Sequence, residues 1–365
     1  MAVVWCAFEF EICVLMGGAM RCSVIASVIF LGISSITAFA DSGDFDMARW
    51  ESVLSDIRER ATAQNISEST INATLRNPEF IPSIVQSDRN QSEFKLTLDE
   101  YLGRTVNSTR VKRGHQMREK YPTLLSRTDE EFGVPPHVIL AFWGMESNYG
   151  EVKSRHRLID AFFTLIYDGR RAKFFGDQLL ALMKISDKNG LDINRIRGSW
   201  AGAMGHFQFI PTTLASYGMD GNGDGRIDII ESVGDAMASA GNYLNKLGWD
   251  KRQKIARRVV IPASFDKSLL DGKTKKTLNE WAELGVMNPD GGAIPRGEMI
   301  AGLVADVTNM PDTESDNEYN PDTDVSPKSV VTAYLTYPNF YRIKKWNNSN
   351  WYAIAIAELA KKLKK

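Results

Sequence analysis

The spacing of apolar residues predicts a chain made mainly of helices. Apolar positions recur every three or four residues, the period of an amphipathic helix, at 44–77 (with a second short helix at 67–75), 96–106, 111–125, 159–167, 174–185, 236–247 and 350–363. Three shorter runs have the composition of strands, at 258–262, 299–304 and 330–335. These patterns predict a helical body interrupted by a small β-rich insert.

The same patterns predict how the chain is divided. We expect an N-terminal helical region over 41–135, a helical core over 136–254 together with 339–365, and the β-rich insert over 255–338. Residues 311–327 are rich in Asp and Glu and hold little that is apolar. A segment of that composition cannot bury itself, so we expect an exposed loop there.

One predicted helix is apolar on every side. Residues 138–145 contain no charged residue, Pro135 and Pro136 suit the first turn of a helix, and Gly150 suits a position just past its end. Glu146 then falls in the last turn of a buried helix. Burial and the negative end of the helix dipole both raise a carboxyl pKa, which favours a general acid. The alternative is a structural carboxylate, held by an arginine or by backbone N–H groups.

A run of small residues follows at 198–205, interrupted only by Trp200 and Met204. Small residues suit a place where backbone closely approaches another backbone or a ligand, and a tightly packed helix pair is a compatible interpretation. Gln208 follows in an apolar setting, where it needs a partner. That partner could be a substrate hydroxyl or a backbone group.

Residues 220–231 have the spacing of an EF-hand loop. Oxygen side chains stand at loop positions one, three, five, nine and twelve, and a glycine stands at position six, as calcium loops require. The candidate ligands are Asp220, Asn222, Asp224, Arg226 through its carbonyl, and either Glu231 or Asp235. A Gly/Asp/Asn turn without metal is the alternative. A single loop of this kind argues for a structural Ca²⁺ and against a calcium sensor.

Residues 1–40 differ from the rest of the 365-residue chain. An apolar run from 23 ends in Ala38-Phe39-Ala40 before Asp41, an A-x-A cleavage pattern typical of a signal peptide. Met20 followed by Arg21 supplies a possible alternative start. We expect an exported, periplasmic protein; an uncleaved leader giving loose membrane association is the alternative.

The cysteine content and the charge balance exclude some kinds of chemistry for the mature chain. All three cysteines lie in this leader, so the mature chain has neither disulfides nor a thiol nucleophile. The leader carries Glu9, Glu11 and Arg21, so its removal leaves equal numbers of basic and acidic residues. That balance gives no support for a nucleic-acid partner.

Several motifs in order resemble the lytic murein transglycosylase B family. They are Trp-Gly-Met-Glu-Ser-Asn-Tyr-Gly at 143–150, Gly-Ser-Trp-Ala-Gly-Ala-Met-Gly at 198–205, Gln208-Phe209, the calcium loop, and Trp-Asn-Asn-Ser-Asn-Trp-Tyr-Ala at 346–353. The resemblance runs from about residue 80 to the C-terminus. It implies a mainly α fold: a lysozyme-like helical core with a small antiparallel β insert and an EF-hand-like calcium loop. It also implies non-hydrolytic cleavage of the MurNAc-β-1,4-GlcNAc bond of peptidoglycan to 1,6-anhydroMurNAc ends. Separately from the resemblance, we expect a monomer that needs no organic cofactor.

The resemblance also implies roles for individual residues. Glu146 is the single acid/base, Ser199 and Asn347 lie beside it, and the glycan groove is lined by Gln208, Tyr243, Arg170, Arg171 and, as a weaker match, Tyr101. Among the calcium ligands it implies Asp235. The chain departs from the family at Trp346, where a tyrosine is frequent, so we expect a hydroxyl contact to be absent while ring stacking is kept.

Hydrolytic glycosidases usually need a pair of carboxylates. Here Glu146 is the one carboxylate for which the sequence predicts a buried, apolar environment. A single carboxylate suffices if the 6-hydroxyl of the sugar is the nucleophile. The runner-up is a muramidase that hydrolyses the same bond with water, with Asp160 or Asp168 as the second carboxylate. A calcium-stabilised glycan-binding module without activity is the alternative from another class.

Overall fold

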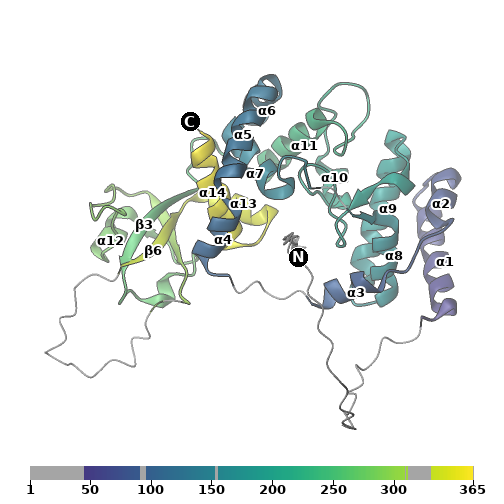
Figure 1. Ribbon diagram of the computed structural model, residues 1–365, viewed down its shortest axis with the longest axis horizontal. Helices are drawn as coiled ribbons and strands as arrows, with labels where there is room; N and C mark the ends of the chain where they lie inside the picture. The colour runs from purple at the N-terminus through teal and green to yellow at the C-terminus, as the bar shows by residue number, and fades with distance from the viewer. Residues whose placement is uncertain (1–44, 91–95, 153–154, 309, 311–329, 365) are drawn as a thin grey trace, which may run out of the picture.

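The computed structural model describes residues 45–90, 96–152, 155–308, 310 and 330–364. The expected leader at 1–40 and the expected acidic loop at 311–327 lie outside these ranges. In the described ranges, no helix combines the length and the apolar character needed to cross a membrane. The mainly helical class expected from sequence is confirmed (Figure 1).

The first three helices pack on α8 (Leu158–Asp168) and α9 (Ala172–Asn189), at the end of the molecule opposite the sheet (Figure 1). They are α1 (Met47–Ala63), α2 (Glu68–Leu75) and α3 (Pro82–Arg89). Asp46 and Ser67 cap the first two with side-chain oxygens, which satisfies N–H groups that a helix start leaves without partners.

The next three helices pack elsewhere, on α7 (Pro136–Ser147) in the case of α5 and α6, and on α14 (Asn350–Leu363) in the case of α4 and α5. They are α4 (Leu98–Thr105), α5 (Ser108–Lys120) and α6 (Pro122–Phe132). The expectation of one helix over 111–125 is wrong, because α5 ends at Lys120 and Pro122 begins a new helix. A proline lacks the N–H that a helix interior needs, but it is tolerated in a first turn.

The centre of the molecule is α7 (Pro136–Ser147), and all its residues from 138 to 147 are buried. Helices α5, α6, α11 (Val233–Lys246) and α14 (Asn350–Leu363) pack around it. The short α10 (Pro211–Tyr217) lies against α9 and α11, and α13 (Pro338–Trp346) against α14. Because α7 is covered on every side, its apolar sequence is explained by burial and not by a membrane.

The β-rich insert is a four-stranded antiparallel sheet in the order β3-β6-β5-β4. Its strands are β3 (Ala256–Pro262), β4 (Lys276–Thr277), β5 (Ile300–Ala305) and β6 (Val330–Thr336). With α12 (Leu278–Glu283) the sheet encloses a second hydrophobic core around Trp281. The expected small antiparallel insert is confirmed. A separate pair, β1 (His156–Arg157) and β2 (Arg197–Gly198), joins the start of α8 to the small-residue run.

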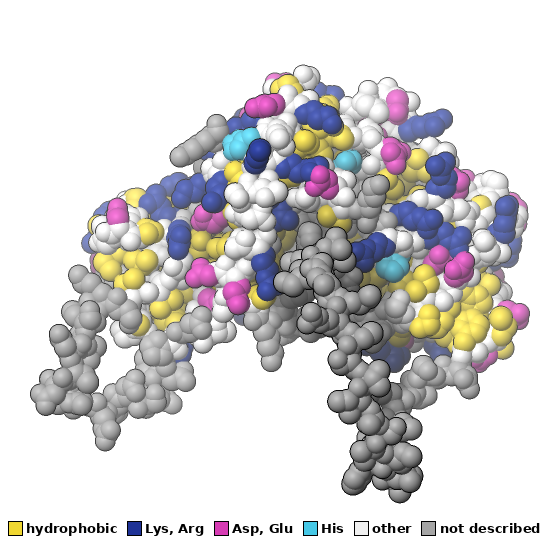
Figure 2. Space-filling view, in the orientation of Figure 1, with side chains coloured by type: hydrophobic (Ala, Val, Ile, Leu, Met, Phe, Trp, Pro, Cys, Tyr) yellow, Lys and Arg dark blue, Asp and Glu magenta, His cyan; other side chains and the backbone are white. Residues whose placement is uncertain are grey.

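Charged side chains of both signs are interspersed over the face shown in Figure 2. This mixture agrees with the nearly equal numbers of basic and acidic residues in the chain.

Candidate active site

The end of α7 is fixed by a tight turn. Asn148 and Tyr149 adopt left-handed backbone conformations (φ 50° and 62°), and Gly150 does so as well (φ 81°). The hydroxyl of Ser147 donates to the carbonyl oxygen of His206 at 2.6 Å and accepts from the amide of Gly150 at 2.9 Å. Ser147, which follows Glu146, is therefore hydrogen-bonded to His206, directly after the small-residue run.

Glu146 is buried, with 7% of its surface exposed. Its Oε1 accepts hydrogen bonds from Trp346 Nε1 at 3.0 Å and from the Tyr352 hydroxyl at 2.5 Å. No ion pair of the described residues includes Glu146. Among the described residues, Glu146 therefore has neither the arginine nor the backbone N–H partner that the structural alternative named, and its catalytic role remains a prediction.

Burial raises the pKa of Glu146 from its ordinary 4.5 to about 7, and the hydrogen bonds from Tyr352 and Trp346 offset part of that rise. The upward direction is the one expected from sequence. A carboxyl group with such a pKa is protonated in a large fraction of molecules near neutrality, as a general acid must be.

Aromatic rings form a wall beside this carboxyl group. The ring of Trp346 lies 4.8 Å from Phe142, 4.9 Å from Tyr243 and 5.4 Å from Phe209, measured between centroids. Tyr243 in turn stacks on Tyr217 at 4.5 Å. The structure therefore brings Trp346 to Glu146, and Tyr243 to Trp346. Because position 346 is a tryptophan, the contact of a tyrosine hydroxyl was expected to be absent. The indole N–H of Trp346 makes a polar contact with Glu146 in its place.

The small-residue run is a series of tight turns, so the interpretation as a helix pair is wrong for 198–205. The Ser199 hydroxyl accepts the Ala203 amide at 3.0 Å. Gln208 has φ 50° and donates from Nε2 to the Gly205 carbonyl at 2.9 Å. Of the two partners left open by the sequence, the backbone group is thus present. The expectation of close backbone approach is met, because β2 pairs with β1 at the start of this run.

Two further residues predicted for the site are Asn347, which follows Trp346 in the chain, and Tyr101 on α4. Oδ1 of Asn347 is buried and has no hydrogen-bond partner among the described residues. An unpaired buried acceptor of this kind needs an explanation, and a ligand donor supplies one. The negative charge of Glu146 contributes, after burial, to raising the pKa of Tyr101, so the Tyr101 hydroxyl lies within electrostatic reach of Glu146.

Arg170 and Arg171 are placed elsewhere. Both guanidinium groups pair with the buried carboxylate of Asp88 on α3. Arg170 bonds Oδ2 through Nε at 2.8 Å and the Asp88 carbonyl oxygen at the same distance, while its side chain stays 49% exposed. Their expected role in the glycan groove remains a prediction. In the structure, both guanidinium groups are bonded to the carboxylate of Asp88, with which a substrate would have to compete.

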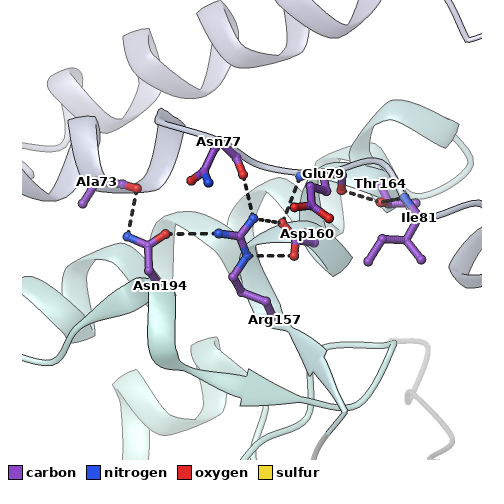
Figure 3. Close-up of polar contacts among 8 residues, drawn as sticks. All are labelled: Ala73, Asn77, Glu79, Ile81, Arg157, Asp160, Thr164 and Asn194. Carbon is purple, nitrogen blue, oxygen red and sulfur yellow. Dashed lines mark hydrogen bonds and ion pairs between the residues drawn. The ribbon is translucent and has the colours of Figure 1, made fainter.

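The two candidate second carboxylates are both held in ion pairs. Figure 3 shows the guanidinium group of Arg157 bonded to both carboxylate oxygens of Asp160. The Nη2–Oδ1 and Nε–Oδ2 distances are 2.6 and 2.8 Å, and the amide of Glu79 donates to the same carboxylate. Asp168 pairs with Arg89 at 2.6 Å, with its side chain 4% exposed. Both carboxylates are thus already bonded to protein groups, so neither is free to hold and activate a water molecule.

The residues of the expected calcium loop turn their oxygens inward. The Asp220 carboxylate accepts the amides of Gly223 and Gly225, at 2.6 and 2.8 Å. Oδ1 of Asn222 accepts the amide of Asp224 at 2.9 Å, and Asp224 accepts that of Arg226 at 2.9 Å. This is the hard-oxygen donor set that calcium prefers.

Two carboxylates, Asp235 and Glu231, are the alternatives for the last calcium ligand. Asp235, in the first turn of α11, is fully buried and accepts the amides of Gly221, Asn222 and Asp228 at 3.0, 3.1 and 2.8 Å. Glu231 is exposed. Asp235 therefore faces the loop. In the described ranges no group of three or more His, Cys, Asp or Glu side chains is arranged to hold a metal, so calcium binding remains a prediction.

Two contacts of the site were missed from sequence. Tyr352 lies within the motif at 346–353 but was given no role, and His206 carries no signal of its own, because each meets its partner, Glu146 or Trp143, across a long separation in the chain. Only the apolar setting of Glu146 indicated that some buried donor was needed.

Comparison with known proteins gives consistent matches. The sequence profile of the family described as "Transglycosylase SLT domain" matches residues 49–361. "Membrane-bound lytic murein transglycosylase B" of Escherichia coli K12 is 29% identical over 264 residues, 71% of this chain and 65% of the relative. The match thus spans less than two thirds of that relative's length.

Solved structures are similar over most of the chain. SltB3 from Pseudomonas aeruginosa, in complex with NAG-NAM-pentapeptide and separately with NAG-anhNAM-pentapeptide, has a TM-score of 0.76 and 35% identity, covering 86% of this chain and 79% of its own. The Escherichia coli lytic transglycosylase SLT35, in complex with calcium, has a TM-score of 0.69 and 25% identity, covering 87% and 92%.

Proposed function

The chain belongs to the family of the transglycosylase SLT domain, and from this we propose that it is a lytic transglycosylase that cleaves the MurNAc-β-1,4-GlcNAc bond of peptidoglycan without water. The single observation that carries the proposal is the setting of Glu146: a buried carboxyl group with neutral donors and no cationic partner among the described residues.

Glu146 acts twice. In its neutral form it donates its proton to the glycosidic oxygen while the bond from that oxygen to C1 breaks. The resulting carboxylate accepts the proton of the muramic acid 6-hydroxyl as O6 bonds to C1, so the anhydro ring closes and Glu146 is neutral again. The N–H of Trp346 and the hydroxyl of Tyr352 stabilise the carboxylate between the two steps, because hydrogen bonds to a charged group are the stronger ones.

The ion pairs of Asp160 with Arg157 and of Asp168 with Arg89 argue against the muramidase alternative. Mass spectrometry of murein digested with residues 41–365 separates the functions. Anhydro-muramic ends are expected; reducing ends would support hydrolysis, and intact murein would support a binding module.

We also infer that loop 220–231 binds a structural Ca²⁺ through Asp220, Asn222, Asp224, the carbonyl of Arg226 and Asp235. The inward-turned oxygens and the buried Asp235 support this. The ion would hold the loop against α11 and takes no part in the reaction.

Removing the ion is expected to lower stability more than turnover. A ligand that binds only the folded state stabilises it by mass action. Excess chelator, or Asp224→Ala in the presence of Ca²⁺, should therefore lower Tm by several degrees relative to the wild-type protein at saturating Ca²⁺. Asp290→Ala is the matched control: its side chain also accepts an amide in a Gly-rich turn, and no calcium effect is expected. A Tm unmoved by chelator would argue against the site.

We propose that residues 1–40 direct export to the periplasm, where the protein acts as a monomer on glycan strands. The A-x-A pattern before Asp41 supports cleavage there. N-terminal sequencing of the exported protein should therefore begin at Asp41; an intact leader in the membrane fraction would indicate an anchor instead.

A further inference from the structure

Both hydrogen bonds to Glu146 fall on the same oxygen. Among the described residues, Oε1 accepts from Trp346 Nε1 at 3.0 Å and from the Tyr352 hydroxyl at 2.5 Å, and Oε2 accepts from none. The indole comes from the end of α13 and the phenol from α14, so separate elements fix one oxygen. The carboxyl group is therefore asymmetric, with one oxygen held by the protein and the other left for substrate.

We propose that Trp346 is a positioning residue that makes Oε1 a permanent acceptor, so that Oε2 alone carries the proton in both steps of the reaction. The inference rests on the proposed transglycosylase function. An indole N–H only donates, so this bond cannot reverse when Glu146 changes its protonation state. In the neutral acid, the oxygen that accepts it is therefore the carbonyl oxygen, and the proton resides on Oε2.

A tyrosine at position 346 would not impose this order. A phenol both donates and accepts, so hydroxyl groups from two tyrosines could rotate and let the proton reside on either oxygen. Tyr352 retains that freedom in principle. The indole removes it, because Oε1 cannot be both the protonated oxygen and a good acceptor from Trp346.

The indole itself is held in place. Its ring contacts Phe142 on α7, Phe209 beyond the small-residue run and Tyr243 on α11, with centroid distances of 4.8 to 5.4 Å. Packing against three separate segments fixes the direction of the N–H. Preorganised donors of this kind stabilise charge without reorganising during the reaction.

The proton path then uses one oxygen. The proton leaves Oε2 for the glycosidic oxygen as the C1–O bond breaks, and Oε2 accepts the 6-hydroxyl proton as C1–O6 forms. No water and no second base enter, and the carboxyl group ends as it began. Oε2 must therefore face both the glycosidic oxygen and the 6-hydroxyl, while Oε1 stays fixed behind it.

Besides burial, the hydrogen bonds from Tyr352 on α14 and from Trp346 shift the pKa of Glu146. Tyr101 on α4 is a further titratable group near it, whose own pKa the charge of Glu146 raises and Arg110 on α5 lowers. No cation pairs with Glu146 in the part of the chain that the structure describes. Loss of the Trp346 N–H should therefore be visible in the titration of Glu146.

The test is Trp346→Phe, which keeps a ring and removes the N–H. Ionisation of Glu146 is followed in the free protein by ¹³C NMR of its carboxyl carbon, and the pH profile of kcat/KM by anhydro-product formation. We expect the Glu146 pKa, and with it the alkaline limit of activity, to rise by about one pH unit. We also expect kcat to fall about tenfold with KM nearly unchanged, because the lost bond matters most to the carboxylate formed during the reaction.

Trp351→Phe is the matched control. It also removes an indole N–H bond, here to the Leu96 carbonyl at 3.3 Å, and should leave the Glu146 titration unchanged. If Trp346→Phe does not fold, benzothienylalanine at position 346 keeps the shape of the indole without its N–H. A Glu146 pKa equal to wild type in the folded variant would overturn the proposal. The NMR titration needs no turnover, so failure of the proposed function would be seen separately, as wild-type protein that forms no anhydro product.

Discussion

Replacing Glu146 by Gln is expected to lower the formation of anhydro-muramic products by about 10³-fold, with binding of glycan strands retained. The amide keeps the size of the side chain and can still accept from Trp346 and Tyr352, but it has no acidic proton to give. Loss of a positioned general acid costs about 10² to 10⁴ in rate, and here the same group is also the base. The measurement is kcat from mass-spectrometric product quantitation, with KM or Kd for glycan strands measured in parallel.

The stability of this variant gives an independent check on the cause. The folded pKa of about 7 exceeds the ordinary 4.5, so the folded chain retains a proton that the unfolded chain releases. Wild-type stability therefore falls as pH rises from about 4.5 to 7, by up to roughly 3 kcal/mol. Glu146→Gln does not ionise, so its free energy of unfolding should show no such fall and should exceed that of wild type at pH 8.

Glu151→Gln is the matched control for this prediction. Glu151 lies in the same turn but is exposed, where it accepts from Asn148 and pairs with Arg113. Its replacement should change activity less than twofold, because exposed ion pairs contribute little. Activity of Glu146→Gln within tenfold of wild type would contradict the assigned role, and a pH-dependence of stability equal to wild type would contradict the raised pKa.

The features that could be predicted from sequence are those encoded locally. The buried helix α7 has prolines in its first turn and a turn glycine after its end, and Glu146 inherits its setting from that position. The spacing of the candidate calcium ligands in loop 220–231, whose binding remains a prediction, is likewise contained in a dozen consecutive residues. Such patterns need no knowledge of the rest of the chain.

The partners of these residues could not be predicted in the same way. Trp346 and Tyr352 reach Glu146 across 200 and 206 residues, and Arg170 finds Asp88 across 82. Each contact depends on how several helices pack, which periodicity does not report. The arginine pair shows the consequence: two adjacent cations indicate an anionic partner but do not say whether it is a substrate or a buried aspartate.

The small-residue run lies between these cases, since its composition indicated close approach without indicating its shape. Gly205 has φ 71°, and an added Cβ would lie 2.5 Å from the carbonyl oxygen of Ile229. That oxygen accepts the amide of His206 at 3.2 Å. His206 is in turn the residue to which Ser147, at the end of α7, is fastened.

Gly205→Ala is therefore expected to destabilise the protein by about 3 kcal/mol or more. The left-handed conformation costs a non-glycine residue about 1 to 2 kcal/mol, and overpacking against a neighbour that cannot rotate away adds about 1 to 3 kcal/mol. Gly133→Ala separates these causes, because Gly133 has φ 69° but nothing within 4 Å of an added Cβ. The free energies of unfolding in urea should differ by about 2 kcal/mol between the two variants.

The same pair of variants tests whether this turn positions α7, the helix that carries Glu146. If Ile229 and His206 shift to admit the new methyl group, the hydrogen bond from Ser147 loosens, and Glu146 moves relative to Ser199 and Gln208. Turnover of the folded fraction should then fall several-fold in Gly205→Ala and stay near wild type in Gly133→Ala. Equal stability and equal turnover in the two variants would mean that the close approach at Gly205 is relieved without cost, and that this loop does not hold the acid in place.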